Sequence, residues 1–66
     1  MEITLNGETR ALPDDLTAAG LIDHLDLTGQ RLAMEVNGEI VPRSEQAMHV
    51  LQAGDKIEIV RAIGGG

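Results

Sequence analysis

Apolar and polar side chains alternate over the first five residues, as they do in a strand with one buried face. Met1, Ile3 and Leu5 are the apolar positions, and the two-residue period places them on the same face. Residues 6–7 are Asn-Gly, a strong hairpin signal because both central residues of such a turn need positive φ. The pattern predicts a hairpin whose second strand covers residues 8–12.

The next segment has the pattern of a short amphipathic helix. Thr17 is a good N-cap residue, and Leu16 and Leu21 have the spacing of a hydrophobic staple across that cap. Leu21, Ile22 and Leu25 form an apolar stripe along one side. We therefore expect the one main helix of the chain here, with this face buried.

Gly20 lies inside the predicted helix, where it costs about 1 kcal/mol relative to Ala. Such a glycine indicates either the close approach of a neighbouring backbone or a weak helix, and we favour the close approach. Asp14 and Asp15 precede the helix, where carboxylates stabilise the positive end of the helix dipole. We expect this structural role for them rather than a carboxylate pair for acid-base chemistry.

The second half of the chain repeats the hairpin pattern. Apolar positions alternate over residues 32–36, and a second Asn-Gly pair follows at residues 37–38. Ile40 and Val41 are adjacent, so in a strand they point to opposite faces and one of them lies at the surface. Pro42 prevents a long continuation of this strand in a central position.

A loop and a last strand complete the pattern. Residues 43–46 resemble a short turn or a 3₁₀ element, and we expect Met48, Val50 and Leu51 to return to the core. The last strand then covers residues 56–63, with two inward-facing isoleucines, Ile57 and Ile59.

The predicted order is strand, strand, helix, strand, strand, strand. A sheet covered on one face by a helix is the expected layer arrangement for such an α+β domain. The long connection through the helix allows the first and last strands to pair in parallel at the centre of the sheet. The sequence therefore predicts a β-grasp fold, with a mixed sheet of four to five strands and one main helix.

Composition limits the size and location of the protein. A chain of 66 residues makes one small domain with a single core. It has no Cys, which fits a reducing compartment such as the cytoplasm. No apolar run approaches the roughly 20 residues that cross a bilayer, and the first residues do not resemble a signal peptide. We expect a soluble, cytoplasmic protein.

Charge limits the partners. Eleven Asp and Glu residues against five Lys and Arg residues give a net charge of −6, which repels nucleic-acid backbones and anionic lipids. The chain also lacks Phe, Tyr and Trp, the stacking residues of single-strand binders. We expect neither nucleic-acid nor membrane binding. The acidity serves either solubility alone or attraction to a basic partner.

Groups suited to catalysis are sparse. Ser44 is the only Ser, and its pairing with His24 or His49 would need a coincidence of folding. The two histidines also lack the closely spaced ligands of a zinc site. The sequence therefore predicts no enzyme active site, no metal site and no bound cofactor.

The most informative feature is the segment of residues 63–66, Ile-Gly-Gly-Gly. Glycines bury no side chain and lose the most backbone entropy when ordered, so we expect a flexible tail of residues 63–66 after a domain of residues 1–62. Extended from Ala62, the tail would reach about 15–18 Å, enough to enter a narrow channel in a partner. The reactive group at its tip is the α-carboxylate of Gly66.

A carboxylate must be activated before it can act as an acyl donor. Attack of the Gly66 carboxylate on the α-phosphate of ATP would give an acyl-adenylate, and a sulfur nucleophile would then displace AMP and leave a thiocarboxylate. ATP and Mg²⁺ would be held by the partner, because this chain has no P-loop or other Gly-rich phosphate motif. The other interpretation is an inert, frayed terminus.

Three segments resemble the ThiS family of sulfur carrier proteins in thiamin (thiazole) biosynthesis, a β-grasp, ubiquitin-like family. They are residues 37–43 (Asn-Gly-Glu-Ile-Val-Pro-Arg), 54–60 (Gly-Asp-Lys-Ile-Glu-Ile-Val) and 63–66. The last two also resemble the small subunit of molybdopterin synthase and other ubiquitin-like modifiers. Two positions depart from the family: Gln46 stands where relatives often carry an aromatic residue, and Gly20 where they carry a larger one.

The resemblance implies a sulfur carrier that is a cosubstrate and not an enzyme. Gly65 and Gly66 would form the reactive Gly-Gly end, with the thiocarboxylate on Gly66. Adenylation would be performed by a ThiF-type, E1-like enzyme that uses ATP and Mg²⁺, sulfur would come from a cysteine desulfurase, and the acceptor would be the thiazole synthase ThiG. The alternatives are a molybdopterin-type carrier, a protein modifier, and a plain β-grasp binding domain.

The alternation in the last strand predicts a docking surface. Because Ile57 and Ile59 point inward, Glu58 and Val60 face outward, directly before the binding residues Ile63 and Gly64. We expect Val60 and one member of the Ile40–Val41 pair to form an apolar centre. Its acidic rim, which would attract a basic partner, is expected to consist of Glu35, Glu39 and Glu58.

Overall fold

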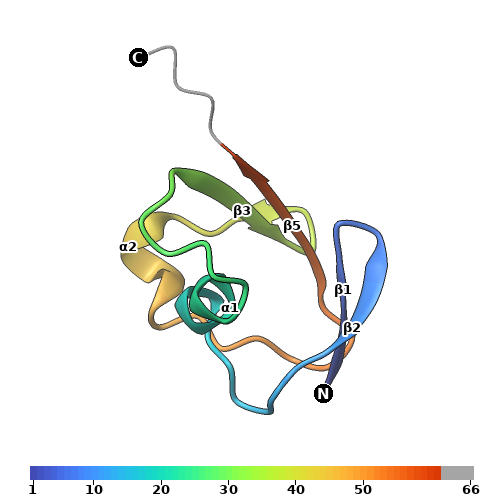
Figure 1. Cartoon of the computed structure of the whole chain (residues 1–66). Helices are drawn as coiled ribbons and strands as arrows, with labels where there is room; N and C mark the ends of the chain where they lie inside the picture. The colour runs from blue at the N-terminus through green and yellow to red at the C-terminus, as the bar shows by residue number, and fades with distance from the viewer. Residues whose placement is uncertain (62–66) are drawn as a thin grey trace.

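One mixed sheet dominates the computed structural model, which describes residues 1–61 (Figure 1). The strands of this part of the chain are β1 (Glu2–Leu5), β2 (Glu8–Ala11), β3 (Leu32–Val36), β4 (Glu39–Ile40) and β5 (Lys56–Arg61). Their order is β2-β1-β5-β3-β4. The central pair, β1 and β5, is parallel and the other pairs are antiparallel. The predicted α+β sheet and its parallel central pair are confirmed.

Both predicted hairpin turns are present, and their backbones explain the residues. Asn6 and Gly7 have φ of 49° and 84°, and Asn37 and Gly38 have φ of 53° and 86°. Positive φ at two successive positions is the geometry of the type I′ hairpin turn, which Asn and Gly adopt at low cost. The two turns fix the register of β1 with β2 and of β3 with β4.

The core lies between the sheet and the helix α1 (Ala18–His24), which covers one face of it (Figure 1). Most inward positions predicted for β1, β3 and β5 are buried and lie in one cluster with Leu21 of α1, whereas Met1 and Leu32 are half-buried at its edge. The buried apolar residues are Ile3, Leu5, Leu12, Ala18, Leu21, Met34, Val36, Val41, Leu51, Ile57 and Ile59. None of the helices in residues 1–61 is long and apolar enough to cross a membrane.

The start of α1 agrees with the predicted cap and explains Gly20. The backbone N–H of Gly20 donates to the Thr17 hydroxyl oxygen over 3.0 Å. A Cβ at Gly20 would lie 2.8 Å from Cδ1 of Leu16 and 3.2 Å from Oγ1 of Thr17. The predicted close approach is therefore real, but side chains of the staple and the cap make it, not a neighbouring backbone.

The segment after β4 differs from the prediction. Residues Arg43–Gln46 form a single α-helical turn, α2, where a short turn or a 3₁₀ element was predicted. Leu51 is buried as expected, but Met48 and Val50 are not in the core: Met48 is 77% exposed and Val50 is also exposed.

The pairing of the loop with the helix cap explains this difference. The N–H of Ala18 donates to the carbonyl of His49, and the N–H of Leu51 donates to the carbonyl of Leu16. Val50 forms an isolated antiparallel bridge with Thr17. The loop is therefore extended here, and since neighbouring side chains of an extended segment alternate, the inward position of Leu51 places Val50 outward.

Candidate functional site

The candidate site begins where β5, at the centre of the sheet, reaches its last residue (Figure 1). Arg61 ends the strand and pairs with Leu32, the first residue of β3. The last two positions of the predicted strand, 62–63, lie outside the described residues. So do the predicted flexible tail and its site residues, Ile63, Gly64, Gly65 and Gly66.

The two neighbours of β5 support it unequally. On one side, β3 pairs with β5 over five positions, from Val36 with Ile57 to Leu32 with Arg61. On the other side, β1 pairs with only two residues of β5, Lys56 and Ile57. The half of β5 that leads to the tail therefore has a strand on one edge only.

Asn6 takes the place of the missing strand on the other edge. The Ile59 N–H donates to Oδ1 of Asn6 over 2.9 Å, and Nδ2 of Asn6 donates to the Ile59 carbonyl over 3.2 Å. One side-chain amide thus satisfies both backbone groups of Ile59, as a paired strand residue would. The sequence analysis assigned Asn6 only to the turn, since no local pattern signals a contact across 53 positions of the chain.

The predicted docking residues lie on the sheet face that α1 leaves uncovered. Val60 is 59% exposed and pairs with Ala33, and Ile40 of β4 is 72% exposed while its neighbour Val41 is buried. The expected outward position of Val60 and of one member of the Ile40–Val41 pair is therefore confirmed. These side chains define the sheet-face patch: Ala33, Ile40 and Val60.

Two of the three predicted acidic residues adjoin the sheet-face patch. Glu35 pairs with Glu58 on one side and with Ile40 on the other, so all three share this face. Glu39 does not, because its partner is Val36, which points to the core, and side chains alternate along β4. The placement of Glu39 in the rim was wrong.

The remaining acidic pair, Glu35 and Glu58, lowers the stability of the domain by charge repulsion. Like charges directly opposite each other in a sheet are destabilising, and Glu35 and Glu58 occupy directly opposite positions. The one ion pair within residues 1–61 joins the Met1 amino group and Asp14, 3.0 Å apart, so neither glutamate is neutralised there. A partner with a basic group over this pair would remove the repulsion.

The described residues form no metal site. No group of three or more His, Cys, Asp or Glu side chains in residues 1–61 is arranged to hold an ion. What the described part offers is an exposed apolar patch with two adjacent glutamates, beside the strand that leads to residue 62.

The fold and this face define a class of protein. A mixed sheet with parallel first and last strands at its centre and a helix across one face is the β-grasp fold. A crystal structure of the thiamine biosynthesis protein ThiS from Geobacter metallireducens is similar, with a TM-score of 0.87 and 26% identity over the whole of both chains.

Sequence comparison gives the family. Residues 3–66 match the ThiS family, and the chain is 33% identical to the sulfur carrier protein ThiS of Escherichia coli over the full length of both. This chain belongs to the ThiS family. It is also 41% identical to a thiazole synthase of Paramagnetospirillum magneticum and 39% identical to one of Magnetococcus marinus, but it spans only 20% of the length of each.

Proposed function

We propose that the chain carries sulfur as a thiocarboxylate on Gly66 and donates it for thiazole formation. The observation that carries this proposal is the family match, which extends through the Gly-Gly end to residue 66. The similarity to E. coli ThiS over the whole chain supports it. In this role the chain is a cosubstrate, and its partners perform the catalysis.

The proposed chemistry has two steps. In the first, a carboxylate oxygen of Gly66 attacks the α-phosphate of ATP, the bond to the β-phosphate breaks, and pyrophosphate leaves. In the second, the terminal sulfur of a persulfide attacks the acyl carbon, the carbon–oxygen bond to AMP breaks, and a thiol reductant then cleaves the sulfur–sulfur bond of the acyl disulfide to leave the thiocarboxylate. A ThiF-type, E1-like enzyme would hold ATP and Mg²⁺ for the first step. A cysteine desulfurase would supply the sulfur for the second.

The acceptor in this proposal is the thiazole synthase ThiG. Two proteins named thiazole synthase contain a segment similar to this entire chain, which supports a close relation between carrier and acceptor. The sheet-face patch would contact the partners, with Glu35 and Glu58 opposite basic groups.

Intact-mass analysis tests the chemistry. The chain is incubated with the ThiF-type enzyme, ATP, Mg²⁺, a cysteine desulfurase with cysteine, and a thiol reductant, and we expect a mass increase equal to sulfur replacing oxygen. Deletion of Gly66 moves the carboxylate back by about 3.5 Å, and Gly65→Val adds a β-branched side chain to a segment inside a narrow channel. Both variants should fold normally and remain unmodified, because misplacement on this scale removes most of the advantage of a positioned nucleophile.

Other results would indicate other functions. Large covalent adducts in a cell extract with ATP would indicate a protein modifier, and an unchanged mass with every partner present would indicate an inert tail. Modification of either variant at the native rate would contradict the assignment of the reactive end.

Substitution of Val60 tests the docking face. Val60→Asp should weaken binding to the activating enzyme or the thiazole synthase by about 1–2 kcal/mol, the usual loss for an interface anchor. Stability should change little, because Val60 is exposed. Met48→Asp is the matched control, since Met48 is an even more exposed apolar residue that follows α2. Equal affinities for the two variants would place the docking face elsewhere.

A further inference from the structure

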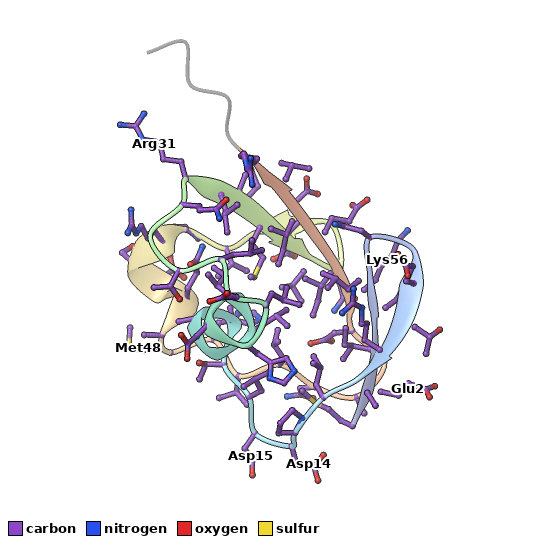
Figure 2. All side chains as sticks on the ribbon, viewed as in Figure 1. Glu2, Asp14, Asp15, Arg31, Met48 and Lys56 are labelled. Carbon is purple, nitrogen blue, oxygen red and sulfur yellow. The ribbon has the colours of Figure 1, made fainter. Side chains whose placement is uncertain are left out.

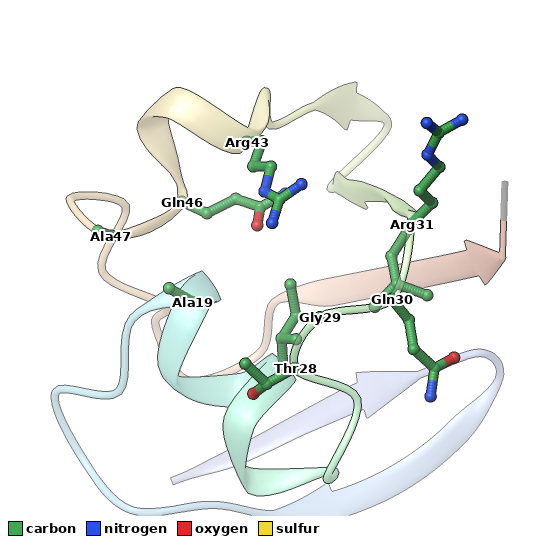
Figure 3. Close-up of a pocket in the computed structure, with 10 residues that line it drawn as sticks. Ala19, Thr28, Gly29, Gln30, Arg31, Arg43, Gln46 and Ala47 are labelled. Carbon is green, nitrogen blue, oxygen red and sulfur yellow. The ribbon is translucent and has the colours of Figure 1, made fainter.

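A second candidate surface lies on the helix side of the molecule. A cavity of about 450 Å³ opens between α1, the loop of residues 28–31 and α2 (Figure 3). Its volume is within the range of about 300–1,000 Å³ that is typical of ligand pockets. We call it the helix groove and define it by its lining residues: Ala19, Ile22, Thr28, Gly29, Gln30, Arg31, Leu32, Arg43, Gln46 and Ala47.

The helix groove is unusual in its charge. The chain has eleven acidic and five basic residues, yet no acidic residue lines the groove, whereas two of the five basic residues, Arg31 and Arg43, do. Neither arginine forms an ion pair within residues 1–61. The lining of the groove therefore carries positive charge on an otherwise acidic protein, and the nearest carboxylate that a hydrogen bond places beside it is Asp23, which accepts from the Thr28 hydroxyl over 3.2 Å.

The interior of the groove combines an apolar floor with a fixed amide. Ile22 and Leu32 are half-buried and pack against the core. Gln46 is only 7% exposed, and its Nε2 donates to the Val41 carbonyl over 3.2 Å. This hydrogen bond fixes the orientation of the amide. In Figure 3 the side chains of Gln46 and Arg43 both extend from α2 toward the groove.

Arg31 lies far from one acidic region of the molecule. In Figure 3 Arg31 stands at the rim and extends outward. Figure 2 shows it near the end of the molecule where β5 ends, with Asp14 and Asp15 at the opposite end. Glu35 and Glu58, which adjoin the sheet-face patch, lie on the other face of the sheet. A negatively charged group that approaches this face is therefore attracted to the two arginines of the helix groove.

We propose that the helix groove binds a segment of a partner protein in which an apolar side chain is flanked by carboxylates. The apolar side chain covers Ile22 and Leu32, and the carboxylates pair with Arg43 and Arg31. The occupant is a protein segment and not a free small acid, because the polar residues at the rim of the groove are exposed. They are Thr28, Gln30, Arg31 and Arg43. Such a rim covers one side of a ligand, whereas small-molecule sites bury about 70–90% of theirs. The rest of the partner covers the other side.

This inference rests on the proposed function in one respect: the partner is one of the enzymes that handle the carrier. Because the groove and the sheet-face patch are on different sides of the sheet, both can be occupied at the same time. Acidic and basic surfaces on different sides also fix the orientation in which the carrier docks.

A peptide titration tests the groove independently of the carrier function. The probe is a capped tetrapeptide with one leucine between aspartate and glutamate side chains, titrated to millimolar concentration into the ¹⁵N-labelled protein. We expect saturable shifts at Ile22, Leu32 and the side-chain amide of Gln46. The double variant Arg31→Gln, Arg43→Gln should bind about tenfold more weakly, because charge-assisted hydrogen bonds are lost. Arg10→Gln, a change of an exposed arginine on β2, is the matched control and should bind as the wild type does.

Three results would overturn the proposal: no shifts at the groove, equal binding by the double variant, or equal binding of the uncharged peptide with Asn and Gln. Hexanoate is the small-acid comparison, and if it bound as tightly as the peptide, the occupant would be a free acid instead of a protein segment. The same variants are then titrated with the ThiF-type enzyme and the thiazole synthase. Weaker binding of the double variant to one of them identifies the partner. Failure of the wild type to bind either enzyme counts against the proposed function, and the peptide result stands separately.

Discussion

The two Asn-Gly hairpins have the same turn and different long-range roles. Their backbones nearly coincide in φ, at 49° and 84° for residues 6–7 and 53° and 86° for residues 37–38. Each asparagine also donates its backbone N–H to β5, Asn6 to the Ile57 carbonyl and Asn37 to the Lys56 carbonyl. The two turns differ in what the side-chain amides contact.

Asn6 holds the half of β5 that leads to the tail, and Asn37 holds its beginning. Both hydrogen bonds of the Asn6 amide go to the Ile59 backbone and are partly buried. The Asn37 amide accepts from the Lys56 N–H over 2.9 Å and donates to the Asp55 carboxylate over 3.0 Å, and both bonds are exposed to solvent. We therefore expect the asparagine to contribute more to stability at position 6, where its amide takes the place of a strand. At position 37, water can replace its hydrogen bonds.

The largest effect is expected for Asn6→Val. A β-branched residue at a φ of 49° is strained by about 1–2 kcal/mol, and loss of the amide leaves two partly buried backbone groups without partners. We expect a total loss of about 3 kcal/mol of unfolding free energy, measured by urea denaturation. Asn37→Val should lose less, because it suffers the same strain but leaves only exposed groups unpaired. Equal losses would show that strain in the turn, and not the contact with Ile59, accounts for the loss of stability.

A smaller and cleaner effect is expected for Asn6→Gly. Glycine tolerates positive φ, so this substitution removes the amide without straining the turn. We expect a loss of about 1–2 kcal/mol, together with faster hydrogen exchange at the Ile59 and Arg61 amides. Asn37→Gly is the matched control and should cost under about 1 kcal/mol, with unchanged exchange at Ile59. Unchanged exchange at Ile59 in Asn6→Gly would contradict the role given to Asn6.

The two hairpins also show which features of the fold can be predicted from the sequence and which cannot. Local patterns were sufficient for both turns, the strands, the main helix and the outward position of Val60, because each depends on alternation or on the φ of one dipeptide. The pairing of Asn6 with Ile59 depends on where β1 ends in the folded sheet, which no local pattern contains.

The errors have similar causes. Val50 and Leu51 are neighbours in an extended segment, and the alternation rule that succeeded at Ile40 and Val41 would have placed only one of them in the core. Gln46 was noted only as a departure from the family, yet it is buried because its amide bonds to the Val41 carbonyl. Polar burial of this kind follows from a specific hydrogen bond, and hydrophobic patterning does not reveal it.

The smallest effect on stability is expected for a substitution of Asp55, which accepts a hydrogen bond from the Asn37 side chain. Asp55 accepts from the Asn37 amide through Oδ1 and from the Gln52 N–H through Oδ2, at 3.0 and 2.8 Å. Asp55→Asn keeps one acceptor oxygen, so one of the two solvent-exposed hydrogen bonds can remain and water can replace the other. We expect the unfolding free energy to change by no more than about 0.5 kcal/mol and the exchange at Ile59 to stay as in the wild type. If Asp55→Asn lost as much unfolding free energy as Asn6→Gly, the contacts of Asn37 would stabilise the beginning of β5 as strongly as those of Asn6 stabilise its second half. The two hairpins would then be equivalent.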